Sequence, residues 1–274
     1  MIRNKSLAFQ LSSLILSAAL LISVALYGYN FWISRSIILK ETSKFAEAET
    51  FKHVYQLDSY ITNAEQIVNS LRIYLENTNY DLKELDFILK KFVEENKNIY
   101  GSCISFEPYN FDSTKKLVAL YYYHKGDKVE FSDLATEKYN YPAYEWFVKP
   151  KELKKPIWSE PYFDEGGGNI PMTTYSVPFY RTVNGNKQFY GIVTCDIALD
   201  WLKGYFDDIR VNNELKSGYG FLTSSNGRII AHKDYSLIMK KTLSELAIDE
   251  NNSEINALFS KIQNGASGSY YLNN

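Results

Sequence analysis

The chain has 274 residues, of which 45% are hydrophobic, and this is enough for one large domain or two small ones with real cores. The 30 Lys and Arg residues and the 32 Asp and Glu residues give a formal net charge of −2 and are scattered along the sequence. No basic field is therefore available for DNA or RNA, and we expect no nucleic-acid partner.

The first predicted element is a membrane-spanning helix at residues 7–29. This segment, LAFQLSSLILSAALLISVALYGY, contains no charged residue, and about 20 apolar residues suffice to cross the hydrocarbon core of a bilayer. Arg3 and Lys5 precede it. The positive-inside rule therefore places residues 1–6 in the cytoplasm and the rest of the chain outside it.

A cleaved signal peptide is the alternative interpretation of the same segment. Signal peptides have a shorter apolar region that ends in a cleavage site between small residues. Here the apolar region is longer, and its outer end carries aromatic residues, as the interfacial belt of a retained anchor does: Tyr27, Tyr29, Phe31 and Trp32. The composition favours an anchor.

A long helix is predicted next, over residues 30–79, because Ser34 to Asn77 contains neither Gly nor Pro. Its apolar residues recur at alternating spacings of three and four: Val54, Leu57, Ile61, Ala64, Val68, Leu71 and Leu75. Such a stripe packs along a domain or pairs with a second copy of itself. We expect the upper part to be a domain spine and the lower part a dimer seam, and a stripe buried wholly within one chain fits equally well.

Short strand-like runs then dominate. The clearest predicted strands are 99–108, 116–126, 172–181 and 188–199, with short helices near 144–147 and 199–209. A long helix followed by an antiparallel sheet indicates an α+β domain, which we place at residues 80–210. The two cysteines, Cys103 and Cys195, form either one disulfide or two buried thiols.

A second, smaller unit is predicted at residues 211–274. Asn226 and Gly227 lie between two apolar runs and predict a hairpin with a type I′ turn. Helices are expected at 237–246 and 253–263. One hairpin and a last broken strand would leave an unpaired sheet edge, so we expect this unit to be incomplete at Asn274.

Four motifs carry a resemblance to a known family: Tyr144-x-Trp146-Phe147, Trp158 to Asp164, Thr173 to Pro178, and Gly191 to Leu199. With the N-terminal span and the long helix, they resemble the double Cache (dCache) sensor domains of bacterial transmembrane receptors. The resemblance implies two tandem PAS-like modules, of which the membrane-distal one binds a small molecule. It also implies a homodimer in the bacterial inner membrane, and a second span and a cytoplasmic output domain (phosphatase, histidine kinase or chemotaxis module) beyond this chain.

The resemblance also indicates where a ligand binds. Many dCache domains hold an amino acid through an Arg-x-Trp-Tyr element and a strand Asp, by charge-assisted hydrogen bonds at both ends of the zwitterion. Here Tyr144 stands at the Arg position, and Asp196 matches the Asp. A pocket of aromatic residues and carboxylates without Arg suits an amine before an amino acid. The candidate ligand-binding residues are Tyr144, Trp146, Phe147, Tyr162, Asp164, Thr174 and Asp196; alternatively, Asp196 caps the helix expected near Leu199.

No motif for catalysis or metal binding is present. The sequence has no G-x-S-x-G, and its Cys and His residues lack metal-ligand spacing. Asp164 to Asn169 lacks the spacing of a calcium loop and is interpreted as a flexible hairpin tip. We therefore expect a sensor with no catalytic residues, no metal and no cofactor. A membrane-anchored hydrolase whose site assembles only in three dimensions, or an adhesion module, are the alternatives.

Overall fold

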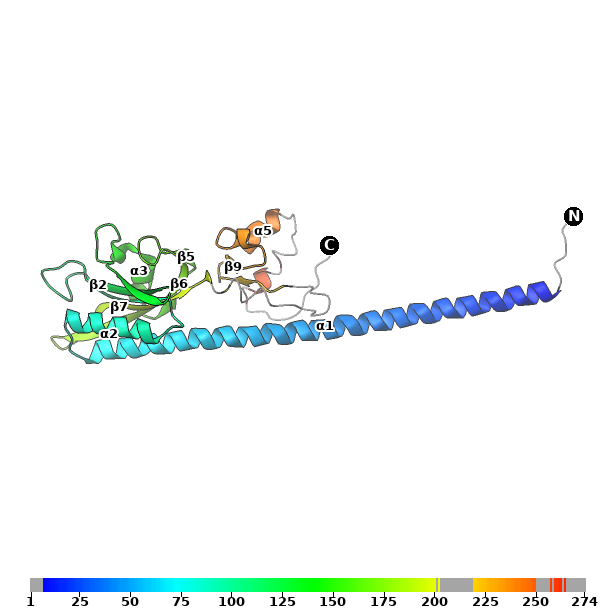
Figure 1. The fold of residues 1–274 in the computed structure, drawn as a ribbon, viewed down its shortest axis with the longest axis horizontal. Helices are drawn as coiled ribbons and strands as arrows, with labels where there is room; N and C mark the ends of the chain where they lie inside the picture. Colours follow the sequence, from blue (N-terminus) through cyan, green and yellow to red (C-terminus); the bar gives the residue numbers. More distant parts are fainter. Residues whose placement is uncertain are drawn as a thin grey trace.

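A computed structural model describes residues 7–200, 202, 219–249, 257, 259–262 and 264. Helix α1 (Leu7–Asn77) runs for 71 residues. At 1.5 Å per residue it is about 100 Å long, and Figure 1 shows its N-terminal half projecting beyond the other elements. The predicted membrane helix and the predicted long helix are therefore one continuous element.

The N-terminal part of α1 has the length and composition of a membrane span. An 18-residue window has a mean hydropathy of 2.1, and none of it is buried against the rest of the chain. Within the described residues, α1 is the one helix that is long and apolar enough to cross a membrane.

A seven-stranded antiparallel sheet lies beside the C-terminal end of α1, in the order β3-β2-β1-β7-β6-β4, with β5 also paired to β6. The strands are β1 (Gly101–Phe106), β2 (Ala119–Lys125), β3 (Lys128–Ser132), β4 (Ile157–Trp158), β5 (Tyr162–Phe163), β6 (Pro171–Val183) and β7 (Asn186–Ala198). The four predicted strands correspond to β1, β2, β6 and β7. Strands β3, β4 and β5 were not predicted from the sequence, and β4 and β5 have only two residues each.

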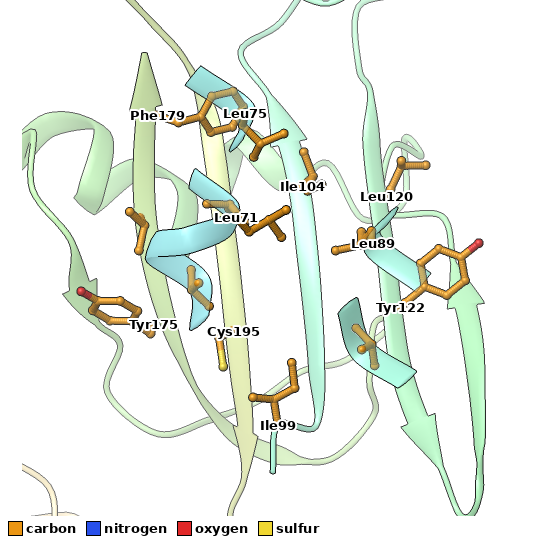
Figure 2. Packing of buried hydrophobic residues seen from close by; sticks show 14 of the residues in the cluster. Leu71, Leu75, Leu89, Ile99, Ile104, Leu120, Tyr122, Tyr175, Phe179 and Cys195 are labelled. Atoms are coloured by element: carbon orange, nitrogen blue, oxygen red, sulfur yellow. The ribbon is translucent and has the colours of Figure 1, made fainter. Parts of the chain in front are cut away.

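One face of the sheet, here called the α1 face, is covered by α1 and α2 (Leu82–Glu95). Helix α2 begins where the Asp81 side chain accepts a hydrogen bond from the Glu84 backbone N–H, at 2.8 Å. Figure 2 shows Leu71 and Leu75 of α1 and Leu89 of α2 against the sheet. The long α1 helix thus shares a core with the sheet.

The opposite face, here called the α3 face, carries η1 (Tyr141–Ala143) and α3 (Glu145–Leu153). Its core combines Trp146 and Phe147 with Cys103, Tyr121 and Ile192 of the strands. Side chains alternate along a strand, so each buried strand contributes side chains to both cores. Buried apolar layers therefore cover both faces of the sheet. The α+β class is confirmed.

The predicted apolar stripe of α1 divides into two parts. Ala64, Val68, Leu71 and Leu75 are buried against the sheet, whereas Val54 and Ile61 are 50% and 39% exposed. The upper part is therefore a spine of the sheet domain, as predicted. The lower part presents apolar side chains to solvent, and a stripe buried wholly within one chain is not what the structure shows.

The second unit contains β8 (Leu222–Thr223), β9 (Ile229–Ala231), η2 (Tyr235–Leu237) and α5 (Leu243–Asp249). The predicted hairpin is confirmed, but the type I′ turn is wrong. Gly227 has a φ of +79° whereas Asn226 is not left-handed, and the Gly227 N–H donates to the Ser224 carbonyl at 2.9 Å. This is a type I turn followed by a left-handed glycine, which is the usual three-residue hairpin loop.

The helix predicted at 237–246 is also placed wrongly, because a capping box delays its start. The Glu245 N–H donates to Thr242 Oγ1 at 3.2 Å, and the Thr242 N–H donates to Glu245 Oε2 at 2.7 Å. Helix α5 therefore begins at Leu243. Most of the helices predicted at 199–209 and 253–263, and the expected chain end at 265–274, lie outside the described residues.

Candidate functional site

A small cavity lies on the α3 face of the sheet, between the strands, α3 and the loop before β6. Its volume is about 10 Å³, which is room for about one water molecule. We call it the carboxylate cavity, and its lining residues are Cys103, Tyr121, Leu134, Tyr139, Trp146, Tyr162, Asp164, Thr174, Thr194 and Asp196. None of these ten residues is basic.

Asp196 points into this cavity from β7, where it pairs with Thr174 of β6. Its side chain is 4% exposed, and its Oδ1 accepts a hydrogen bond from Thr174 Oγ1 at 2.8 Å. The Thr174 hydroxyl in turn lies 2.8 Å from the Tyr162 hydroxyl. Asp196 is not a helix cap here, because the Leu199 N–H donates to the Pro171 carbonyl at 3.0 Å.

Burial raises the pKa of the Asp196 carboxyl to about 7. The Thr174 hydrogen bond lowers this pKa, the nearby charge of Asp164 raises it, and the Tyr121 hydroxyl lowers it. That hydroxyl is buried and has no hydrogen bond of normal geometry, although it lies close enough to affect the carboxyl. A carboxyl group with this pKa, in a cavity and without a cation beside it, is a typical binding-site feature.

Asp164 provides a second carboxylate and organises the loop between β5 and β6. It is 3% exposed, and its two oxygens accept hydrogen bonds from the Tyr139 hydroxyl and the Gly168 N–H, both at 2.6 Å. The Tyr100 hydroxyl also donates to the Gly168 carbonyl at 2.9 Å. The loop is a hairpin loop as expected, because β5 and β6 pair with each other, and it folds inward over the cavity.

Gly167 makes this inward fold possible. A Cβ atom at this position would lie 2.1 Å from Asp164 Oδ2, so no other residue fits without displacing the carboxylate. Gly167 and Gly168 are both buried. The loop residues 164–169, here called the cavity loop, therefore close directly on Asp164.

Aromatic rings form the rest of the wall. Trp146 is 4% exposed, and Tyr139 stacks on Tyr144 with ring centroids 4.5 Å apart and planes at 5°. Burial and then the charge of Asp196 raise the pKa of the Tyr162 and Tyr121 hydroxyls, so both remain neutral donors at physiological pH.

Five of the seven predicted site residues meet at the carboxylate cavity: Trp146, Tyr162, Asp164, Thr174 and Asp196. Tyr144 lies one layer behind, against Tyr139. Phe147 packs against Tyr141 in the core of the α3 face. The first and last positions of the aligned four-residue element, Tyr144 and Phe147, therefore support the site and do not line it.

The sequence analysis missed five lining residues: Cys103, Tyr121, Leu134, Tyr139 and Thr194. Strand alternation was an available signal for Thr194, which lies two residues before Asp196 and so faces the same side. Its Oγ1 accepts a hydrogen bond from the Cys103 N–H at 3.0 Å. Leu134 and Tyr139 come from an irregular segment, where no periodic pattern identifies them.

Both cysteines are free and buried. They lie on opposite faces of the sheet, since Cys103 lines the carboxylate cavity and Cys195 belongs to the core of the α1 face. Among the described residues, no group of three or more His, Cys, Asp or Glu side chains is arranged to hold a metal ion.

Residues 85–204 match the family model described as the first PDC sensor domain of methyl-accepting chemotaxis protein-like receptors. This segment is thus similar to PDC sensor domains. The predicted resemblance to double Cache sensors is thereby confirmed, as is the predicted class of the chain, a sensing module of a membrane receptor.

A curated relative of the PDC domain is the methyl-accepting chemotaxis protein PscA of Pseudomonas syringae pv. tomato. The two are 27% identical over 124 residues, which is 44% of this chain and 18% of PscA. The chain thus matches less than a fifth of that relative's length. The matched family consists of sensor domains and not of enzymes.

Solved structures share the fold at low sequence identity. The extracellular domain of the putative histidine kinase mmHK1S-Z2 is 23% identical, with a TM-score of 0.66, and the match covers 85% of this chain and 86% of that one. The ligand-binding domain of Mlp24, solved with asparagine, is 16% identical, with a TM-score of 0.50 and coverages of 78% and 79%.

Proposed function

We propose that this chain is the extracytoplasmic input domain of a membrane receptor, and that the carboxylate cavity binds a small amine. The observation that carries the proposal is the pairing of Asp164 and Asp196, both buried, in a cavity whose ten described lining residues include aromatic rings and no basic residue. The two carboxylates lack a positive partner, and the ammonium group of a ligand would supply one.

The physical argument concerns the cost of burying charge. A buried carboxylate without a cationic partner loses its hydration, and Asp196 compensates only partly, through Thr174. An ammonium group between Asp164 and Asp196 would restore that lost interaction. The faces of Trp146 and Tyr139 would add cation–π attraction to the same group.

Amino acids are the second candidate class. The related fold of Mlp24 was solved with asparagine, and Asp196 would hold the ammonium end of such a ligand equally well. A carboxylate end, however, would enter a cavity that already contains two carboxylates and has no Lys, Arg or His in its lining. Amines therefore rank before amino acids.

Ligand entry requires the cavity loop to move, because about 10 Å³ does not hold an organic amine. The loop contains Gly166, Gly167 and Gly168, and it is tied down through Asp164 and the Tyr100 hydroxyl. An ammonium group that competes for Asp164 would release the Gly168 N–H from that carboxylate. The same group would thus open the loop and occupy the space.

In the proposed receptor, residues 7–29 cross the bacterial inner membrane and the rest of the described chain lies outside the cytoplasm. Helix α1 connects the sheet domain, at residues 80–210, to the membrane, and residues 211–274 form the proximal module. The half-exposed Val54 supports a homodimer seam along the lower part of α1.

The test uses the full chain in lipid nanodiscs. We expect primary alkylamines to raise its melting temperature, amino acids to do so less, and monocarboxylates not at all. Thermal unfolding followed by circular dichroism measures this shift, with empty nanodiscs as the blank. Stabilisation by carboxylates alone would contradict the amine proposal.

The affinity for an alkylamine is expected to fall at low pH. The ligand needs Asp196 ionised, whereas the amine itself stays cationic below a pH of about 10. Because the pKa of Asp196 is about 7, the apparent Kd should be flat above that pH and rise up to about tenfold per pH unit below it. Titration calorimetry at pH 8, 7, 6 and 5 checks this, and an affinity that is constant across this range would exclude Asp196 as the partner.

A further inference from the structure

A second and larger hollow lies on the α1 face of the sheet, opposite the carboxylate cavity. Its volume is about 500 Å³, within the usual range of small-molecule pockets. We call it the back groove. Three parts of the chain line it: Ile61 of α1, Ile197 of β7, and Leu222 and Ile230 of the second unit. In Figure 1 the second unit lies beside α1, next to the sheet domain.

The charged side chains that line the back groove, in the part of the chain that the structure describes, all have the same sign. Its described lining residues include the acidic Asp58 and Glu160, and none of those described residues is Lys, Arg or His. The Ser225 hydroxyl donates to Glu160 Oε1 at 2.6 Å. The other carboxylate oxygen, Glu160 Oε2, is buried and has no hydrogen-bond partner. A buried carboxylate oxygen without a donor is costly, so this position requires one.

The back groove and the carboxylate cavity lie on opposite faces of the same two strands, β6 and β7. Thr173 pairs with Ile197 and Thr174 with Asp196 in adjacent rungs of the β6–β7 ladder. Successive residues of a strand point to opposite faces, so Thr174 and Asp196 line the cavity while Thr173 and Ile197 line the groove. A ligand in the groove would therefore contact the same two strands that carry the primary site.

We propose that the back groove is a second binding site, for an amphiphilic amine. The apolar body of the ligand lies between Ile61, Ile197 and Ile230, and its ammonium group pairs with the Glu160 carboxylate, which lines the groove. The apolar walls provide the hydrophobic contribution, and the single-sign charge of the groove selects a cation over an anion. Such a ligand bridges α1, the sheet and the second unit, which are the three parts that line the groove.

The experiment uses the full chain in nanodiscs with the substitution Asp196→Asn, so that the carboxylate cavity does not contribute. The probe is 4-phenylbutylamine, and 4-phenylbutanol and 4-phenylbutanoate are the matched neutral and anionic controls. Titration calorimetry is performed on Asp196→Asn alone, with Glu160→Gln added, and with Ile61→Trp added. Glu160→Gln keeps the shape of the side chain and an acceptor for Ser225.

We expect 4-phenylbutylamine to bind the Asp196→Asn chain and to lose at least about tenfold in affinity when Glu160→Gln is added, since a hydrogen bond to a charged group is lost. Ile61→Trp should reduce binding by filling the groove. The proposal is overturned if Glu160→Gln changes the Kd by less than about threefold, or if the neutral or anionic control binds as tightly. It is overturned equally if no probe binds, because the chain itself then fills the groove. If the carboxylate cavity proved not to bind amines, the effect of Glu160→Gln on the affinity of the back groove for 4-phenylbutylamine would be unchanged.

Discussion

Asp196→Asn is expected to weaken alkylamine binding at pH 8 by about 100-fold or more. The substitution keeps the size of the side chain and an oxygen that accepts from Thr174 Oγ1, so the cavity retains its shape. It removes the buried negative charge that faces the ligand, and loss of one partner of a buried charge pair costs about 2–5 kcal/mol. Titration calorimetry on the full chain in nanodiscs measures the change.

The same substitution should stabilise the unliganded chain, and the sign follows from proton linkage. The pKa of Asp196 is about 7 in the folded chain against an ordinary value of 3.8. Between these values the folded state holds a proton that the unfolded state has released, so stability falls as the pH rises from about 4 to 7. One pKa unit corresponds to about 1.4 kcal/mol, so the free energy of unfolding falls by ~4 kcal/mol over this pH range. Asp196→Asn removes this loss because the amide does not ionise.

The control for both effects is Asp127→Asn, which removes an exposed carboxylate in the turn between β2 and β3. It should change neither amine affinity nor the pH profile by more than the error of measurement. Thermal unfolding of the wild-type chain and both variants at pH 4, 6 and 8 separates the outcomes. An Asp196→Asn chain that binds amines within threefold of wild type would show that Asp196 is not the ammonium partner.

The main helix and the long strands could be predicted from patterns in the sequence. The stripe from Ala64 to Leu75 predicted the face of α1 that is buried, because apolar side chains at helical spacing need one apolar partner surface. The long strands β6 and β7 were predicted from β-rich runs bounded by turn residues. By contrast, β4 and β5 have two residues each, which is too short to show any period, and they pair with β6 through tertiary contacts.

Only part of the candidate site could be predicted from the sequence. Asp196 and Thr174 were identified through motifs and proved to be neighbours across the β6–β7 ladder. Tyr139 was missed because it reaches Asp164 from an irregular segment, and that contact depends on the packing of η1 and α3. Sequence spacing thus located the strand residues of the cavity, whereas its loop residues required the folded chain.

Gly191→Ala is expected to cost about 3 kcal/mol or more of folding free energy. A Cβ atom at this position would lie 2.1 Å from the Ser105 backbone carbonyl oxygen and 2.7 Å from the Phe179 ring. The ring can shift, but the carbonyl belongs to β1, which pairs with β7 at this point. Relieving the overlap therefore means separating two central strands, and overpacking of this kind is among the most destabilising of substitutions.

The matched control is Gly126→Asn in the exposed turn between β2 and β3. Gly126 has a φ of +61° and nothing within 4 Å of its Cβ position, and Asn tolerates this left-handed conformation. Urea unfolding should leave Gly126→Asn close to wild type and shift the midpoint of Gly191→Ala strongly downward. Because β7 also carries Asp196, amine binding and the folded fraction of Gly191→Ala should decrease together as urea is added. Binding that disappears while the sheet remains folded would instead mean that Gly191 acts on the cavity directly, and that the β1–β7 register does not set the position of Asp196.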